Sequence, residues 1–418
     1  MKLTKTTPMR GGELRNSLHR LALVAMAALA TPCVTHAAVP SVSDVQVGQD
    51  DSRLVTISYT LKDAGAIVTM EVLTNDVPIG RSLWANATGD VTVKVAPGER
   101  KIFWQPRDTW PDRKIRDKSF AVKLTVWPLD NPPDYMCVDL ATPSNVVWYI
   151  SSNDVPGGVT AEAYKTDKLL MRRIHAEGVR WRMGIGGDAV KQRAHTVILT
   201  NDYYIGVYTV TYDQRNSFYD AAGTAGKQPD VTMSYEALRG ATASYNWPNN
   251  GSAVDPTRLL GVLRAHSGIS SFDLPTEAEW EYACRAGTTT RWSFGDDSAN
   301  AIMALYAWYR NGAVSSSLHE VGLLLPNAWG LYDMHGNTWE WCLDWYSDGD
   351  AFCRTGDDVI SPVGPDTGSD RCLRGGSYAH FDTHARSGNR DGGTQPPASP
   401  YRTIGYRLVC TANFNDAQ

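Results

Sequence analysis

The sequence predicts an all-β sandwich, residues 39–130, followed after a connecting segment, residues 134–165, by a loop-rich α+β domain, residues 166–412. Two observations predict this order. Between residues 42 and 127, short runs of alternating apolar and polar residues are separated by turn-forming residues, with no helical pattern between them. Beyond residue 134 regular patterns become sparse, and seven of the 14 tryptophans fall between Trp280 and Trp345, as expected where buried aromatic rings hold loops together.

The first 37 residues have the order of charged and apolar side chains that is typical of a signal peptide. Five basic side chains and a single acidic one, Glu13, accompany the apolar run LALVAMAALA at residues 21–30. This run is shorter than the roughly 20 residues that a spanning helix needs. VTHAA at residues 34–38 offers small residues for cleavage, which we expect after Ala37. The alternatives are a lipoprotein acylated at Cys33 and an uncleaved membrane anchor.

Cleavage after Ala37 predicts a secreted or periplasmic protein with no transmembrane segment in the mature chain. It removes five of 40 basic and one of 45 acidic residues, which leaves 35 and 44 and a net charge of −9. This charge argues against nucleic acid as the main partner. In an oxidising compartment an even number of cysteines predicts disulfides, with free thiols as the alternative. Six cysteines allow 15 pairings, and the sequence does not choose among them; a local bond between Cys342 and Cys353 is one of the pairings left open. The six that remain are Cys137, Cys284, Cys342, Cys353, Cys372 and Cys410.

The predicted strands of the sandwich are RLVTISYTL, IVTMEVLT, VTVKVA, RKIFWQP and FAVKLTVWP. Short strands at this spacing predict an antiparallel sandwich of immunoglobulin or fibronectin type. We interpret it as a spacer or docking module, with a sugar-binding module as the alternative. PLDNPPDY, residues 128–135, is the predicted linker, and YMCVDLA and NVVWYIS predict two short strands in the connecting segment.

The clearest helix is LPTEAEWEYACRAG, residues 274–287. Thr276 followed by Glu279 three residues later predicts a capping box, and Gly287 is expected to end the helix. Glu277 and Glu279 favour the positive helix start, so we interpret them as helix-start residues rather than a catalytic acid and base.

The stretch NAWGLYDMHGNTWEWCLDWY, residues 327–346, places two carboxylates around a Gly-Asn turn. Carboxylate and carbonyl oxygens on a tight loop are the ligands that Ca²⁺ prefers. The candidate ligands are Asp333, Gly336, Thr338 and Glu340. The alternative is that Glu340 is a buried hydrogen-bond anchor, and His335 is expected to be a polar loop residue.

Two histidines and an aspartate follow a Gly-Gly turn in RCLRGGSYAHFDTHARSG, residues 371–388. His380 and His384 would share one face of a helical turn, and with Asp382 they are ligands that zinc, iron or copper(II) accepts. Solvated loop histidines are the alternative. Arg386 and Arg390 are expected to brace the loop through carbonyls or carboxylates.

Six segments match one family in the family's own order: RWRMGIGG, HTVILTNDYYIGVYTVTYDQ, LPTEAEWEYACRAGT, NAWGLYDMHGNTWEWCLDWY, LRGGSY and GYRLV. On these segments the chain resembles the formylglycine-generating enzyme, or sulfatase-modifying factor, family over about residues 164–410. The resemblance implies a compact, atypical C-type-lectin-like fold. It also implies calcium in the loop of Asp333 and Glu340, through these two side chains and the carbonyls of Gly336 and Thr338.

The resemblance also implies an oxidase reaction that this sequence lacks the ligands for. True formylglycine generators oxidise a cysteine of a sulfatase with O₂ and a copper(I) ion, which two cysteines hold just after the RGGSY segment. Copper(I) requires soft thiolate ligands. Here the matching positions are His380 and Ala385, and no cysteine lies between Cys372 and Cys410, so we expect no copper.

Three functions remain open at this point. The first is an exported family member without copper oxidase activity, whose cleft binds an extracytoplasmic peptide, glycan or protein; its expected lining is Trp339, Ser377, Tyr378 and Arg386. The second is an oxidase of the formylglycine-generating type with iron or another transition metal at His380 and His384. The third is a structural envelope or assembly protein, attached through the sandwich. The absent cysteine pair favours the first.

Overall fold

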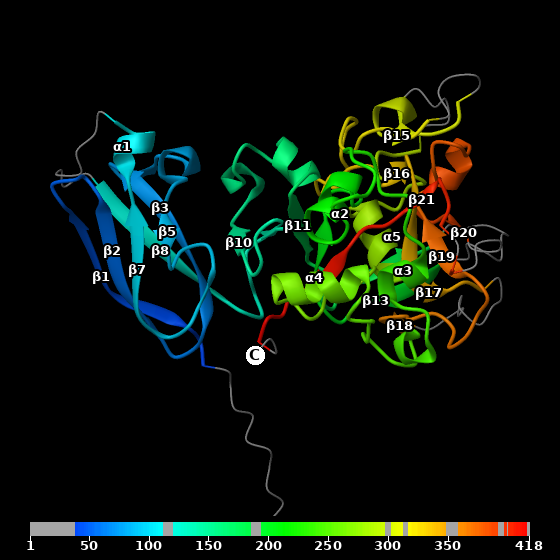
Figure 1. The fold of residues 1–418 in the computed structure, drawn as a ribbon, viewed down its shortest axis with the longest axis horizontal. Coiled ribbons are helices and arrows are strands. Elements are labelled where there is room, and N and C mark those ends of the chain that lie inside the picture. The colour runs from blue at the N-terminus through cyan, green and yellow to red at the C-terminus, as the bar shows by residue number, and fades with distance from the viewer. Residues whose placement is uncertain are drawn as a thin grey trace, which may run out of the picture. The chain divides into compact units, whose positions relative to one another are not determined.

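The computed structural model describes residues 38–111, 120–184, 194–296, 302–311, 317–347, 358–391, 397, 398 and 400–415. The predicted signal peptide and Cys353 lie outside the described residues. Within these ranges strands predominate, and the helices are few and short (Figure 1).

Two antiparallel sheets form between residues 41 and 128. One has the strand order β1-β2-β7-β5, and the other has β4-β3-β6 with β8 paired to β3. The predicted run RLVTISYTL is β2, in which every second side chain from Val55 to Leu61 is buried. Buried residues of β2, β3 and β7 join one apolar cluster, while the immunoglobulin or fibronectin type stays a prediction. The elements are β1 Ser41–Gln49, β2 Val55–Lys62, β3 Ala66–Thr74, β4 Val77–Pro78, η1 Arg81–Trp84, β5 Thr88–Gly89, β6 Lys94–Val95, β7 Gly98–Trp104, α1 Pro106–Thr109 and β8 Phe120–Pro128.

The largest sheet of the remaining chain has the order β10-β9-β11-β14-β22. The two short strands expected in the connecting segment are β9 and β10, and β9 pairs antiparallel with β11, so they join this sheet. The strands and intervening 3₁₀ turns are β9 Tyr135–Asp139, β10 Val146–Tyr149, η2 Ser152–Asp154, η3 Glu162–Lys165, β11 Lys168–Ile174, β14 Tyr203–Gly206 and β22 Val409–Thr411.

Smaller sheets, short α-helices and 3₁₀ turns make up the rest. A four-stranded sheet, β20-β19-β17-β21, carries the NTWEWCLDW and RCLR segments side by side. The other elements are β12 Arg180–Met183, β13 His195–Ile198, α2 Tyr212–Phe218, α3 Tyr235–Arg239, η5 Ala243–Tyr245, α4 Leu259–Ser267, α5 Glu277–Arg285, η6 Met303–Leu305, β15 Ala307–Trp308, β16 His335–Gly336, β17 Trp339–Trp345, β18 Val359–Ile360, β19 Arg371–Arg374, η7 Asp382–Ala385, β20 Arg390–Asp391 and β21 Ile404–Gly405.

Helix α5 is the helix that the sequence predicts most sharply. The Thr276 hydroxyl accepts a hydrogen bond from the Glu279 backbone N–H, and the Glu279 side chain accepts one from the Thr276 N–H, so the capping box is present. The helix ends at Arg285, two residues before the predicted end, because Ala286 adopts the left-handed conformation with φ 47°.

Buried tryptophans hold the loops of the C-terminal part together. Trp280, Trp292, Trp339 and Trp341 are all fully or almost fully buried. The Trp341 indole N–H donates to the Met233 carbonyl oxygen at 3.3 Å, as expected for a buried indole. The Trp292 indole nitrogen, by contrast, is buried without a partner among the described residues.

The disulfide prediction is wrong for every cysteine that the structure describes. Five of the six predicted partners are buried free thiols: Cys137, Cys284, Cys342, Cys372 and Cys410. They lie within strands and a helix, and Cys372 hydrogen-bonds with the Glu277 carboxylate and the Arg390 guanidinium. The pairing of Cys342 with Cys353 involves a residue outside the described ranges.

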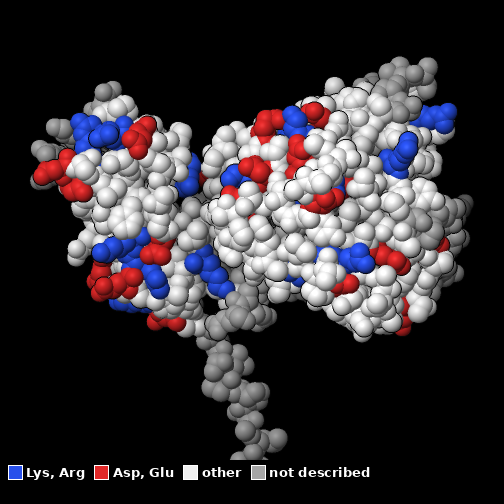
Figure 2. All heavy atoms as spheres, in the orientation of Figure 1, with Lys and Arg blue, Asp and Glu red and all other residues white. Residues whose placement is uncertain are grey.

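The face shown in Figure 2 carries basic and acidic side chains interspersed with each other. In the described part of the chain, no helix has both the length and the apolar character needed to cross a membrane.

Candidate functional site

The loop predicted to hold calcium forms a tight turn before β17. Asp333, Gly336 and Asn337 all have positive φ, 56°, 83° and 61°. A Cβ at position 336 would lie 2.1 Å from the Trp308 carbonyl oxygen, so only glycine fits there. Asp333 is buried, and burial raises the pKa of its carboxyl to about 6. Its Oδ2 accepts a hydrogen bond from the Gly322 N–H at 2.7 Å.

Glu340, the second carboxylate of this loop, is fully buried and saturated with hydrogen bonds. Its Oε1 accepts from the Thr209 hydroxyl at 2.8 Å, and its Oε2 accepts from the Trp280 indole N–H at 2.6 Å. Arg407 donates to both oxygens, with Nη2 to Oε1 at 2.8 Å and Nε to Oε2 at 3.0 Å.

These bonds occupy the lone pairs that Glu340 would offer to an ion, and a guanidinium already neutralises its charge. In this arrangement Glu340 therefore does not fit calcium, and the predicted set lacks one of its two carboxylates. The structure agrees with the alternative, in which Glu340 is a buried hydrogen-bond anchor, and calcium stays a prediction from the resemblance.

Trp339, Ser377, His380 and His384 lie together, and we name these four residues the Ser377 cluster. The rings of His380 and His384 have centroids 5.2 Å apart, and each makes an edge contact with the Trp339 ring. The Trp339 indole N–H donates to Nδ1 of His380 at 3.3 Å, and the Ser377 oxygen lies 2.6 Å from the same nitrogen.

The protonation of His380 follows from these contacts. An indole nitrogen only donates, so Nδ1 of His380 is an acceptor, and the Ser377 hydroxyl donates to it as well. Burial, and then the neighbouring His384, lower the pKa of His380, which favours the neutral imidazole with its proton on Nε2. Nδ1 is therefore occupied, and Nε2 is the nitrogen left for a ligand.

The other predicted cleft residues lie around this cluster. The half-buried Tyr378 donates its backbone N–H to the Asn337 carbonyl at 3.0 Å. The Arg386 guanidinium lies over the Trp292 ring, 5.9 Å from its centroid. Asp382 begins the 3₁₀ turn η7. The described residues contain no group of three or more His, Cys, Asp or Glu arranged to hold a metal, so His380, Asp382 and His384 do not form the predicted three-ligand set.

A second constellation, which the sequence did not predict, is centred on Glu277. Its fully buried carboxylate pairs with Arg374 at 2.8 Å and accepts two hydrogen bonds from Arg390, at 2.6 and 2.7 Å. The Cys372 thiol donates to it at 3.3 Å. Burial acts to raise the pKa of Glu277, but the two guanidinium groups outweigh burial and hold it below its usual value. Arg390 is expected to brace the loop through carbonyls or carboxylates, and the Glu277 carboxylate is its partner here.

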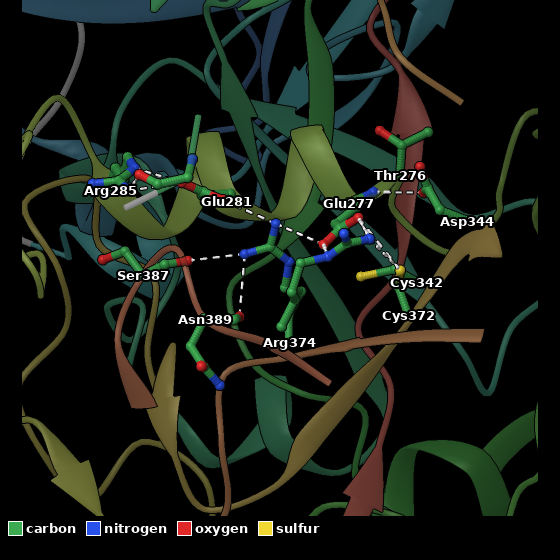
Figure 3. A network of polar contacts seen from close by, with 12 residues as sticks. Thr276, Glu277, Glu281, Arg285, Cys342, Asp344, Cys372, Arg374, Ser387 and Asn389 are labelled. Carbon is green, nitrogen blue, oxygen red and sulfur yellow. Dashed lines mark hydrogen bonds and ion pairs between the residues drawn. The ribbon is translucent and has the colours of Figure 1, made fainter. Parts of the chain in front are cut away.

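The network continues along α5 and into the loop after β19 (Figure 3). Arg374 also pairs with Glu281 at 2.9 Å, and Glu281 accepts a hydrogen bond from Arg285 at 2.8 Å. Arg374 further donates to the Ser387 and Asn389 carbonyls, each at 3.2 Å. It therefore fixes both ends of the segment that contains Ser377, His380 and His384.

One pattern in the sequence could have indicated part of this network. Glu277, Glu281 and Arg285 recur at four-residue spacing, which places them on one helix face. Their partners Arg374 and Arg390 come from segments about 100 residues away in the chain, and no spacing rule connects them with the helix.

Comparison with known proteins agrees with the segments that suggested a family. The family model described as "Sulfatase-modifying factor enzyme 1-like domain" matches residues 165–412, which is more than half of the chain. The chain belongs to this family.

Curated relatives of this sulfatase-modifying factor domain include two formylglycine-generating enzymes. The protein from Streptomyces coelicolor is 36% identical over 157 residues, which cover 34% of this chain and 47% of that protein. The one from Bos taurus is 33% identical over 148 residues, 32% of this chain and 38% of that protein. The chain thus spans less than half the length of these relatives.

Among solved structures, Treponema denticola variable protein 1 is similar, with 28% identity and a TM-score of 0.45. The likeness covers 58% of this chain and 95% of that one. In this sulfatase-modifying factor domain, the Ser377 cluster occupies the segment where the resemblance implies two copper-binding cysteines, at the positions of His380 and Ala385.

Proposed function

We propose that this chain is an exported member of the family that does not act as a copper oxidase. Its Ser377 cluster serves instead as a binding surface for a peptide, glycan or protein outside the cytoplasm. One observation carries the proposal: His380 and Ala385 stand where copper(I) would need thiolates.

The state of the described thiols supports this proposal. Each of the five is buried, and burial raises its pKa, to about 12 for both Cys137 and Cys284. The same cause raises the pKa of Cys342, Cys372 and Cys410. Copper(I) binds the thiolate, so these side chains are poor substitutes for the absent pair.

The chemistry of the Ser377 cluster supports a binding role. Its two imidazoles, His380 and His384, are half-buried and reach the surface, while Trp339 and Ser377 are buried and contact these rings. Aromatic faces beside hydrogen-bonding groups are typical of recognition surfaces. The Glu277 network holds the backbone on both sides of this cluster, which limits the ordering cost of binding.

The alternative is an oxidase with a transition metal on His380 and His384, and the 5.2 Å approach of their rings is the observation in its favour. Metal analysis of the purified chain, paired with an aldehyde assay on a Cys-x-Pro-x-Arg peptide under Cu(I) and Fe(II), separates the two. We expect no copper or iron and no turnover. One copper or iron per chain, with turnover lost in His380→Ala, would overturn the proposal.

Thermal unfolding with and without a chelator tests whether the loop of Asp333 and Glu340 binds calcium. Because Glu340 neutralises Arg407, Glu340→Ala is expected to lower the unfolding midpoint with or without a chelator. A chelator response in the unaltered chain that disappears in Glu340→Ala would instead assign calcium to this loop.

A further inference from the structure

The buried cation of Arg371 has no carboxylate partner. Arg371 begins β19 and is 2% exposed. It donates to the Trp247 carbonyl at 3.1 Å, to the Leu343 carbonyl at 2.6 Å and to Oδ1 of Asn246 at 2.7 Å. All three acceptors are neutral, and no acidic side chain of the described residues forms an ion pair with it.

The other arginines that are buried this deeply differ in this respect. Arg239, Arg374 and Arg407 are at most 1% exposed. Each is matched by at least one carboxylate, from Asp273, from Glu277 and Glu281, and from Glu340 respectively. A buried charge is costly unless it is paired. Arg371 differs from these three arginines because no described carboxylate forms an ion pair with it.

Two of the five N–H donors of Arg371 remain unused. Its three hydrogen bonds take both hydrogens of Nη1 and one of Nη2, and its Nε is buried without a partner. The unused donors therefore belong to Nε and Nη2. Nε and Nη2 are neighbouring nitrogens of the planar guanidinium, a group whose donors match the oxygens of a carboxylate.

Arg371 also lines a pocket of about 220 Å³. Its guanidinium carbon lies 3.3 Å from the centroid of the Trp345 ring and 4.3 Å from that of Tyr235, and both rings line the same pocket. Stacking on Trp345 fixes the plane of the guanidinium. Ala241 and Asn246 are further lining residues, and none of the Ser377 cluster is among them.

We propose that this pocket binds a carboxylate group, which Arg371 holds through its unused donors. The ligand supplies the negative charge that no described acidic side chain gives to Arg371 through an ion pair. Burial lowers the pKa of Arg371 to about 10, a sign that its surroundings disfavour the charge, and a bound anion offsets this. The site is independent of the function proposed for the Ser377 cluster.

Thermal unfolding of the full chain in sodium acetate, against sodium chloride at equal ionic strength, tests the proposal. We expect acetate to raise the midpoint of the unaltered chain and to leave that of Arg371→Met unchanged. Ala241→Trp decides the matter if Arg371→Met does not fold, because residue 241 is exposed and a large ring there blocks the pocket. Ala222→Trp, at an exposed alanine that does not line the pocket, is the matched control and keeps the response.

An acetate response that persists in Ala241→Trp would overturn the proposal, as would the lack of any response in the unaltered chain. An equal response to sulfate would overturn the preference for a planar carboxylate. Glu236 is the one acidic residue among those that line the pocket, so Glu236→Gln is expected to tighten acetate binding severalfold. Titration with N-acetylaspartate amide and with glucuronate identifies the source: tighter binding of the first assigns an acidic peptide, and of the second an acidic sugar.

Discussion

At the scale of single residues, Glu277 has one role in its helix and another in the folded chain. As the first residue of α5 it favours the positive end of the helix. In the folded chain it is completely buried between Arg374 and Arg390. The second role dominates energetically, because a carboxylate in the interior is stable only with its partners.

Replacing this carboxylate tests that ranking. Glu277→Gln leaves two guanidinium groups without their shared counter-charge, and we expect a loss of about 3–5 kcal/mol in the free energy of unfolding, measured by urea titration. The control is Glu71→Gln, since the Glu71–Lys123 pair has side chains 33% and 62% exposed. That change is expected to cost less than about 1 kcal/mol. Equal losses would contradict the assigned role.

Asp344 makes stability depend on pH. Its Oδ2 accepts from the Glu277 backbone N–H, and its Oδ1 is buried without a partner. Burial, and then the charge of Glu277, raise the pKa of Asp344 from 3.8 to about 7. Above pH 3.8 the unfolded chain releases this proton while the folded chain keeps it, so the cost to folding grows up to about pH 7 and is then constant.

Asp344→Asn removes this titration. We compare the free energy of unfolding of the variant with that of the unaltered chain. The difference, variant minus unaltered, is expected to grow by roughly 1–3 kcal/mol between about pH 4 and pH 8. Denaturant titrations at the two pH values measure the change. Parallel pH profiles for the two proteins would mean that Asp344 is already ionised in the fold.

At the scale of elements, α5 connects local sequence to the candidate site. Its capping box starts the helix, and its buried face carries Trp280, which donates to Glu340. The neighbouring strands β17 and β19 bring Glu340 opposite Arg374. Helix α5 therefore carries side chains that contact both Glu340 and, through Arg374, the segment after β19.

Loss of the helix cap is expected to have a smaller effect than loss of the buried pair. Thr276→Ala removes the hydroxyl that accepts from the Glu279 N–H and is expected to cost about 1 kcal/mol of unfolding free energy. Thr242→Ala is the matched control, because Thr242 precedes η5 without a side-chain cap bond. A comparable loss in both variants would show that the Thr276 hydroxyl does not act as a cap.

At the scale of the whole molecule, the described chain is held together without disulfides. Its five described cysteines are buried free thiols, two of them on the paired strands β17 and β19. Buried arginine–carboxylate pairs and tryptophan packing hold the loops instead.

Thiol labelling tests this organisation. Iodoacetamide is expected to leave the peptides of these five cysteines unmodified in the native chain and to modify them in denaturant, because burial removes access and raises the thiol pKa. Peptide mass spectrometry provides the measurement. Peptides joined by a disulfide, or native labelling of any of the five, would contradict it.

The sequence by itself determined the features that depend on near neighbours. Alternation predicted β2, the Thr276–Glu279 spacing predicted the cap of α5, and the quoted segments predicted the family. These features follow from the backbone period and from ordered motifs, which the linear chain carries explicitly.

Only the tertiary structure decided which distant groups meet. Arg390 reaches Glu277 across 113 positions of the chain, and Arg407 reaches Glu340 across 67. Whether a carboxylate faces a guanidinium, an ion or water depends on topology, because pairing between distant segments has no period in the sequence. For the same reason the sequence predicted disulfides that the five described cysteines do not form, and it carried no sign that Arg371 is buried without an ion pair to a described acidic side chain.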